Sequence, residues 1–339
     1  MTPRAFSIAT LSATAALSLA LAPQQPPANP AFSFHTSVAL INVTATVTDA
    51  NGRFVPNLHA NDFEVYEDGQ PRAIQQFESE RVPVSLGLAI DTSGSMLGDK
   101  ITAARSALNR FLYDLLDQRD QVFIYRFDSR PTLVVDWTDD RRGAAAALGT
   151  LKPNGGTAIY DAVAEAVTRA ATGTRRKKAV VVISDGNDTS SRTSLDELVA
   201  LIRSSEVLVY AIGIDASGDL SPLAPQTIPV PSPFPGKGPA TRRAPRSPSP
   251  SKGRAPDYDR VNPDALRGIT DDTGGRTEVI RSVSDLDPAT ADIADELSRQ
   301  YFIGYASAAP KDGRWHTIEV KLKRSGNYTV RARRGFVAK

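Results

Sequence analysis

Four short, nearly continuous apolar segments in the middle of the chain constrain its fold most strongly. They lie at residues 84–90, 122–127, 179–183 and 207–214. Apolar runs of this length, without polar alternation, are typical of strands buried on both faces of a parallel sheet. Amphipathic helical patterns separate them. This order of strand, helix and strand predicts an α/β fold, a doubly wound and mostly parallel sheet.

Three helical stripes connect the apolar segments. Their apolar residues recur every three or four positions, starting at Ile101, Ile159 and Leu195. Core packing explains these stripes, so we give them no other role. Residues 132–137 follow their neighbour strand closely and are expected to form an antiparallel edge. The remaining elements are expected as a helix at 262–270, a strand at 276–280 and a last helix at Leu286–Arg299.

Both flanks of this region have the pattern of half-buried strands. Residues 39–48 alternate apolar and polar side chains, and Asn51-Gly52 predicts a hairpin turn after them. Further strands are expected at Phe63–Glu67, 73–77, Tyr301–Ala306, 316–324 and 328–333, with Asp68-Gly69 as a second turn. Each set of strands alone exposes a sheet edge, and pairing the two sets covers both. We therefore expect one antiparallel β-domain built from residues 32–82 and 301–339, with residues 83–300 inserted into it.

The first 22 residues have the composition of a secretory signal. One arginine precedes an uncharged run of small and apolar residues at 5–22. The run is also near the length of a membrane anchor, although its Ala, Ser and Thr content favours cleavage. Either interpretation predicts an exported protein, periplasmic or secreted, and cleavage would leave no membrane span.

A different segment interrupts the α/β pattern. Residues 216–258 are rich in Pro, Ser, Gly and Arg and lack apolar periodicity, so we expect a disordered insertion. It follows a strand and should leave from the same face as the polar clusters described below. It could screen that face or attract an acidic partner, but a solvated loop without a role is the simpler interpretation.

Composition excludes several classes of site. The chain has no cysteine, which rules out disulfides, thiol catalysis and Cys-ligated metals. Lys plus Arg is 40 and Asp plus Glu is 38, so the formal charge is +2. This near balance gives no global reason to expect nucleic acid or an anionic membrane as the partner.

Three polar clusters should meet at the carboxyl ends of the parallel strands, where ligands bind in such sheets. They are Asp91-Thr92-Ser93-Gly94-Ser95, Gly155-Gly156-Thr157 and Ser184-Asp185-Gly186. Their candidate ligands Asp91, Ser93, Ser95, Thr157 and Asp185 offer only oxygen, which suits a hard cation such as Mg²⁺ or Mn²⁺ and suits zinc poorly. Hydroxyls add no charge, so the ion stays electrophilic. An Asp or Glu carboxylate of a protein partner could then displace one of its waters.

The spacing of these clusters resembles the von Willebrand factor type A family. Asp91-x-Ser93-x-Ser95 ends the first apolar strand, and Thr157 and Asp185 follow in the family's order. The resemblance covers roughly residues 83–300, and it implies a Rossmann-like fold and a metal-ion-dependent adhesion site (MIDAS) made by these five residues. By this resemblance Asp91, Ser93 and Ser95 hold the ion, directly or nearly so. Thr157 and Asp185 exchange between direct and water-mediated contact, often together with a shift of the last helix.

The flanks resemble those of a bacterial subgroup of exported proteins related to this family. The segments concerned are Asp62-Phe63-Glu64-Val65-Tyr66 and Tyr301-Phe302-Ile303-Gly304-Tyr305. The insertion at 216–258 departs from the family pattern, which puts the family's usual ligand surface in doubt for this chain.

Other interpretations compete with the metal site. Ser95 could cap a helix, and Asp161, Asp188 and Asp215 are expected to be caps or solvated loop charges. A Ser–His hydrolase is disfavoured because His35, His59 and His316 all fall in or beside the predicted β-domain. We therefore predict metal-dependent protein binding, in adhesion or envelope assembly, without enzyme activity. The alternatives are a structural envelope protein with a stabilising metal and, less favoured, a metal-dependent hydrolase.

Overall fold

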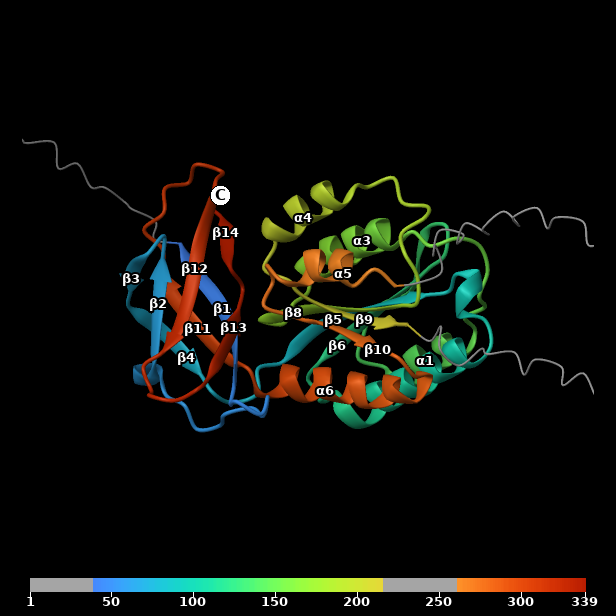
Figure 1. The fold of residues 1–339 in the computed structure, drawn as a ribbon, viewed down its shortest axis with the longest axis horizontal. Coiled ribbons are helices and arrows are strands. Elements are labelled where there is room, and N and C mark those ends of the chain that lie inside the picture. The colour runs from blue at the N-terminus through green and yellow to red at the C-terminus, as the bar shows by residue number, and fades with distance from the viewer. Residues whose placement is uncertain (1–38, 216–260) are drawn as a thin grey trace, which may run out of the picture. The chain divides into compact units, whose positions relative to one another are not determined.

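The computed structural model describes residues 39–215 and 261–339, and a six-stranded sheet forms the centre of its α/β part (Figure 1). The strand order is β10-β9-β8-β5-β6-β7. Neighbouring strands are parallel except β7, which pairs antiparallel with β6 at the edge, as predicted. The strands are β5 (Val84–Asp91), β6 (Gln121–Phe127), β7 (Pro131–Thr138), β8 (Lys177–Ser184), β9 (Leu208–Ile214) and β10 (Thr277–Ile280).

Helices cover both faces of this sheet (Figure 1). One face packs against α1 (Asp99–Arg110), α2 (Arg141–Gly149) and α6 (Leu286–Arg299), and the other against α3 (Ile159–Ala171), α4 (Leu195–Arg203) and α5 (Pro263–Thr270). Successive side chains of a strand point to opposite faces. Leu88 of β5 therefore packs in the first core and Ala89 in the second. The predicted doubly wound sheet is confirmed.

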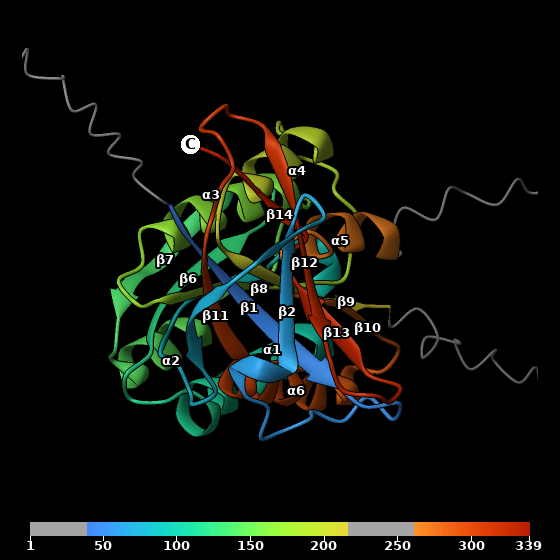
Figure 2. The same ribbon diagram turned by 90° about the vertical axis from the view of Figure 1, so that its left-hand side faces the viewer.

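Two antiparallel four-stranded sheets form the other part, and we call them the β-sandwich (Figure 2). The first has the order β13-β1-β11-β4, and the second β14-β12-β2-β3. Their strands are β1 (Leu40–Thr48), β2 (Phe63–Glu67), β3 (Gln70–Arg72), β4 (Ile74–Glu78), β11 (Tyr301–Ala306), β12 (Trp315–Leu322), β13 (Thr329–Ala332) and β14 (Gly335–Val337). Each sheet combines strands from both flanks, as predicted.

Alternating side chains build the core between these two sheets. In β12, Ile318 and Val320 are buried while Glu319 and Lys321 are exposed. Side chains of both sheets share one apolar cluster, which Tyr301 joins through ring contacts with Phe54, Phe63 and Phe77. Because β1 pairs with β11 from Leu40 opposite Ala306 to Ala45 opposite Tyr301, the first and last strands depend on each other.

Some elements differ from the sequence-based expectations. The turn at Asp68-Gly69 joins β2 to the short strand β3, whereas β4 crosses to the other sheet and pairs with β11. Both turn residues have positive φ, which Asp and Gly tolerate. Helix α2, which follows the N-cap Asp140, was not expected, nor was β14. Helix α1 continues into a π-helical turn at Phe111–Leu115.

The predicted signal sequence at residues 1–22 and most of the segment preceding β1 lie outside the described residues, as does the predicted insertion at 216–258. Among the residues that are described, no helix combines the length and the apolar character needed to cross a bilayer.

Candidate metal centre

The fold brings the three polar clusters together at one edge of the central sheet. Strands β5 and β8 are parallel neighbours, with Ile90 opposite Ile183, so Asp91 and Ser184 end adjacent strands. Thr157 lies just before α3. Two backbone bonds tie the loops to each other: Gly94 N–H donates to the carbonyl of Gly155 (3.0 Å), and Asn154 N–H donates to that of Thr92 (2.7 Å).

Asp91 is fully buried at the end of β5. Its Oδ1 accepts a hydrogen bond from the Ser93 N–H at 2.7 Å, and its Oδ2 accepts one from the Ser184 hydroxyl. Burial nevertheless raises the pKa of the Asp91 carboxyl to about 6, because a charge removed from water is poorly solvated. Each carboxylate oxygen keeps a second lone pair. A cation beside Asp91 would stabilise its ionised form.

A chain of hydroxyl groups connects the first cluster to Asp185. The Ser93 and Ser95 hydroxyls lie 3.0 Å apart, and Ser95 Oγ donates to Asp185 Oδ1 at 2.8 Å. The other oxygen of Asp185 accepts a bond from Lys100 Nζ at 2.5 Å. Asp185 and Ser93 are buried, whereas Ser95 is exposed. The cluster therefore opens to solvent at Ser95.

Thr157 approaches the same edge from its own loop. Its N–H donates to the Thr189 hydroxyl at 3.0 Å, and its carbonyl accepts bonds from the N–H groups of Thr189 and Ser190. The Thr157 hydroxyl faces Gly186, where an added Cβ would lie 3.5 Å from Oγ1. The structure thus links Asp91, Ser93, Ser95 and Asp185 through hydrogen bonds, and places Thr157 beside Gly186 without a direct bond to those four.

The charges of the site are not balanced. Two buried carboxylates, Asp91 and Asp185, face a single ammonium, Lys100, which leaves one negative charge. No group of three or more His, Cys, Asp or Glu side chains that could hold a metal occurs within residues 39–215 and 261–339. An ion at this edge must therefore use hydroxyl and water oxygens as well, as Mg²⁺ commonly does. The residues present fit such an ion.

Sequence reasoning missed two contributors to the site. Lys100 lies in the first turn of α1, and only its helical position after the Asp91–Ser95 motif could have indicated its contact with Asp185. Leu97, also at this loop, is 72% exposed. Its side chain places apolar surface beside the polar cluster.

Competing roles for single residues are now decided by their contacts. The Ser95 hydroxyl binds side chains and caps no helix, since the N-cap of α1 is Gly98. Asp188 accepts a bond from the N–H of Tyr160 at the start of α3, and Asp161 accepts bonds from backbone N–H groups of the 192–193 loop. These two aspartates hold loops in place, as expected. His59 and His316 lie in the β-sandwich, and His35 lies outside the described residues.

The central part of the chain is similar in sequence to known proteins. Residues 86–187 match the family model of the von Willebrand factor type A domain. An uncharacterized protein from Synechocystis sp. is 34% identical over 111 residues, which cover 32% of this chain and 26% of that protein. The match thus spans about a quarter of the length of this relative.

Solved structures with a similar fold include bacterial and animal proteins. The conserved hypothetical protein BatB from Bacteroides thetaiotaomicron is 21% identical, with a TM-score of 0.43, over 63% of this chain and 98% of that one. Proximal thread matrix protein 1 of the mussel byssus, with a zinc-occupied MIDAS motif, is 14% identical, with a TM-score of 0.47, over 68% and 49%. On the match of residues 86–187, the chain contains a von Willebrand factor type A domain.

Proposed function

We propose that the chain binds a protein partner through a divalent metal ion, Mg²⁺ or Mn²⁺, held by Asp91, Ser93, Ser95, Thr157 and Asp185. The partner supplies an Asp or Glu carboxylate to the ion. The binding is non-catalytic, as is usual for von Willebrand factor type A domains. The ion supplies a Lewis-acidic position, and the residues of the chain hold and orient it.

The charge count at the site carries this proposal. Asp91, Asp185 and Lys100 leave one negative charge, which attracts a cation. A divalent ion converts this into one positive charge, so the loaded site attracts a carboxylate. Lys100 is essential to this reversal, because two carboxylates alone would merely neutralise the ion.

The surroundings of the site also suit a protein partner. Ser95 is exposed, so an ion beside it is accessible to a ligand from outside. Leu97 adds apolar surface at the same loop. Protein interfaces commonly combine an apolar contact with a few strong polar ones.

The first test is calorimetric titration of Mg²⁺ and Mn²⁺ into the chain. We expect saturable binding that Asp91→Asn abolishes, because the ion loses its buried charged ligand. Asp136→Asn is the matched control, since Asp136 is an exposed aspartate on β7. Wild-type protein that binds neither ion would contradict the metal site.

The second test separates metal binding from partner binding. Lys100→Met should tighten Mg²⁺ binding by about tenfold, because the site then carries two negative charges. The loaded site becomes neutral, so the variant should bind a short capped peptide with one Glu more weakly than wild type does. The same peptide with Gln is the neutral control. If Mg²⁺-loaded wild type binds the two peptides equally, the ion does not bind a carboxylate. The result would then favour the structural alternative, in which the metal only stabilises the fold.

We further propose export through a signal sequence at residues 1–22, and a von Willebrand factor type A domain at 83–300 inserted in a β-domain made of 32–82 and 301–339. The composition of the first segment supports export, and the strand pairing between both flanks supports the insertion. Proteolysis of the secreted protein and N-terminal sequencing would test the cleavage site and the boundaries together.

A further inference from the structure

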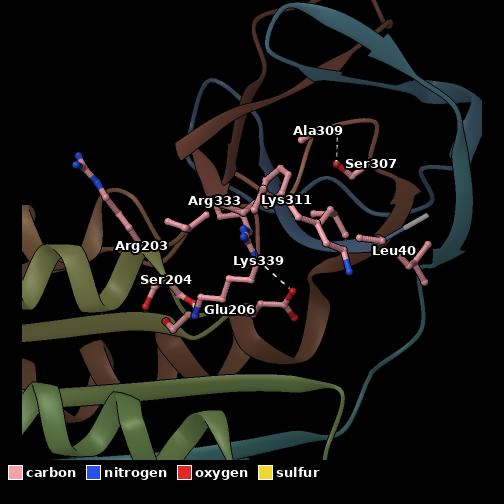
Figure 3. A pocket seen from close by; sticks show the side chains of 15 residues that line it. Leu40, Arg203, Ser204, Glu206, Ser307, Ala309, Lys311, Arg333 and Lys339 are labelled. Atoms are coloured by element: carbon pink, nitrogen blue, oxygen red, sulfur yellow. Dashed lines mark hydrogen bonds and ion pairs between the residues drawn. The ribbon is translucent and has the colours of Figure 1, made fainter. Parts of the chain in front are cut away.

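A cavity of about 260 Å³ lies between the end of α4 and the β-sandwich, and none of the candidate metal ligands lines it. Figure 3 looks into it: Arg203, Ser204 and Glu206 stand on the α4 side, and Ser307, Ala309 and Lys311 on the sandwich side. Arg333, which lies between β13 and β14, lines the same cavity.

Arg333 is a buried cation without a full set of partners. It is 8% exposed, and its Nε donates to the carbonyl of Gly335 at 2.9 Å. Its Nη1 is buried and has no hydrogen-bond partner. The nearest carboxylate oxygen, Oε1 of Glu206, is 3.7 Å from Nη1, and the Glu206 side chain is half exposed. Burial lowers the pKa of the Arg333 guanidinium, because its charge is removed from water.

The remaining walls define what the cavity can accept. Lys311 and Lys339 add positive charge, and the Lys339 Nζ is bonded to the Ser204 carbonyl at 3.1 Å. Leu40 and Phe336 supply apolar surface. Glu206 opposes Arg333, Lys311 and Lys339, and Arg203 already pairs with Asp272, so the lining stays net positive and favours an anion. The volume is smaller than that of most drug-sized ligand sites, so the ligand is small.

We propose that this cavity binds a small apolar carboxylate, whose oxygens pair with the Arg333 guanidinium while its aliphatic part packs on Leu40 and Phe336. Such a carboxylate belongs either to a free aliphatic acid or to the C-terminal residue of a peptide. A guanidinium is suited to this role because its parallel N–H groups match the two oxygens of a carboxylate. The site is independent of the proposed metal function.

Calorimetry and thermal shift on the full chain test the proposal with four probes. These are 4-methylpentanoate, N-acetyl-leucine, N-acetyl-leucinamide and inorganic phosphate. We expect one or both carboxylates to bind saturably and the neutral amide not to bind. Binding of 4-methylpentanoate alone would indicate a free acid, and preference for N-acetyl-leucine a peptide end. Absence of binding by both carboxylates, or stronger binding of phosphate, would overturn the proposal.

Three variants assign the binding to Arg333. Arg333→Met should weaken it by about ten- to a hundredfold, the loss expected for a charge-assisted hydrogen-bonded pair. Arg334→Met is the control, because Arg334 is exposed and pairs with Asp271 and Asp272. Since Arg333→Met removes a buried side chain, Glu206→Gln gives an independent test in a half-exposed position. It removes the competing carboxylate and should tighten binding by about threefold. Unchanged or weaker binding in Glu206→Gln would also overturn the proposal.

Discussion

Two buried polar clusters lie at opposite ends of the central sheet, and they balance their charges in opposite ways. At the carboxyl ends of the strands, Asp91 and Asp185 share the single cation Lys100. Near the amino-terminal end of β9, Glu296 of α6 pairs with two guanidiniums, Arg276 and Arg331. The first cluster lacks positive charge, whereas the second has a cation for each oxygen of its central carboxylate.

The hydrogen bonds of the Glu296 cluster connect several elements of the fold. Glu296 also accepts bonds from the hydroxyls of Tyr210 (2.8 Å) and Thr46 (3.2 Å), and the Gln300 side chain bonds to both of those hydroxyls. Thr46 lies in β1, Tyr210 lies in β9 and Gln300 directly follows α6, so the cluster joins the β-sandwich to the α/β part. A carboxylate that pairs with two cations holds a structure together, whereas two carboxylates that share one cation attract a further cation. The two clusters therefore predict opposite responses to loss of a carboxylate.

The largest change in stability is expected at the Glu296 cluster, which joins the β-sandwich to the α/β part. Glu296→Ala leaves Arg276 and Arg331 without their shared partner, and the free energy of unfolding should fall by about 3 kcal/mol, as it does when one member of a buried ion pair is removed. Urea denaturation measures this change. Asp295→Ala on the same helix is the control, because Asp295 is half exposed and pairs only with Arg299. Its loss should cost less than about 1 kcal/mol. Equal losses in the two variants would contradict a structural role for the Glu296 cluster.

The buried Lys177, which is close to the Glu296 cluster, should make the free energy of unfolding depend on pH. Lys177 Nζ donates to the Leu297 carbonyl at 2.7 Å, and burial lowers its pKa to about 7. The unfolded chain, with an ordinary lysine pKa of about 10.5, then binds more protons than the folded chain between pH 7 and pH 10. The cost of burying the charged Lys177 ammonium applies in full below pH 7. It decreases as the pH rises, because the ammonium loses its proton. This group should therefore add about 2 kcal/mol to the free energy of unfolding from pH 7 to pH 9.

Urea denaturation at pH 7, 8 and 9 checks this expectation against Lys177→Met. The variant lacks the titrating group, so its free energy of unfolding should rise by about 2 kcal/mol less than that of wild type between pH 7 and pH 9. Lys178→Met is the control, because Lys178 is the next residue of the same strand and is only partly buried. A wild-type pH dependence matching that of Lys177→Met would show that Lys177 stays protonated in the folded chain.

The smallest effect, of opposite sign, is expected at the candidate metal centre. In EDTA at pH 7, Asp91→Asn removes a buried charge whose pKa is raised to about 6, and the variant should be more stable than wild type by about 1 kcal/mol. Saturating Mg²⁺ should stabilise wild type alone and reverse the order. If Asp91→Asn is less stable than wild type in EDTA, as is expected of Glu296→Ala, the Asp91 cluster also has a structural role and the contrast between the two clusters is wrong.

Most of the fold could be predicted because its elements have strong periodic patterns. Continuous apolar runs identified β5, β6, β8 and β9, alternation identified β1, and the turn at Asp68-Gly69 indicated β2. The missed elements have weak patterns: β3 and β14 have three residues each, and α2 is dominated by alanine. The exchange of β4 into the other sheet was also missed, because strand pairing depends on contacts between residues far apart in the chain.

The candidate site was predictable only as a set of ligands. Its residues follow strand ends, and the parallel sheet brings strand ends together, so Asp91 and Asp185 could be placed from sequence. Their electrostatic environment could not. The contact between Lys100 and Asp185 depends on the direction of a long side chain from α1, and the pairs of Glu296 depend on how α6 meets the β-sandwich. Neither leaves a periodic signal in the sequence.

The pairing of the first strands with the last has a consequence for how the chain acquires its structure during synthesis. Leu40 of β1 pairs with Ala306 of β11, so this sheet cannot form until the chain beyond residue 300 has been made. The α/β part between them contains its own local contacts and can fold first. Residues 40–78 must therefore wait, with unpaired strand edges, while the α/β part brings the two flanks within reach of each other. We therefore expect closure of the β-sandwich around its own insertion to be a late and slow step in folding.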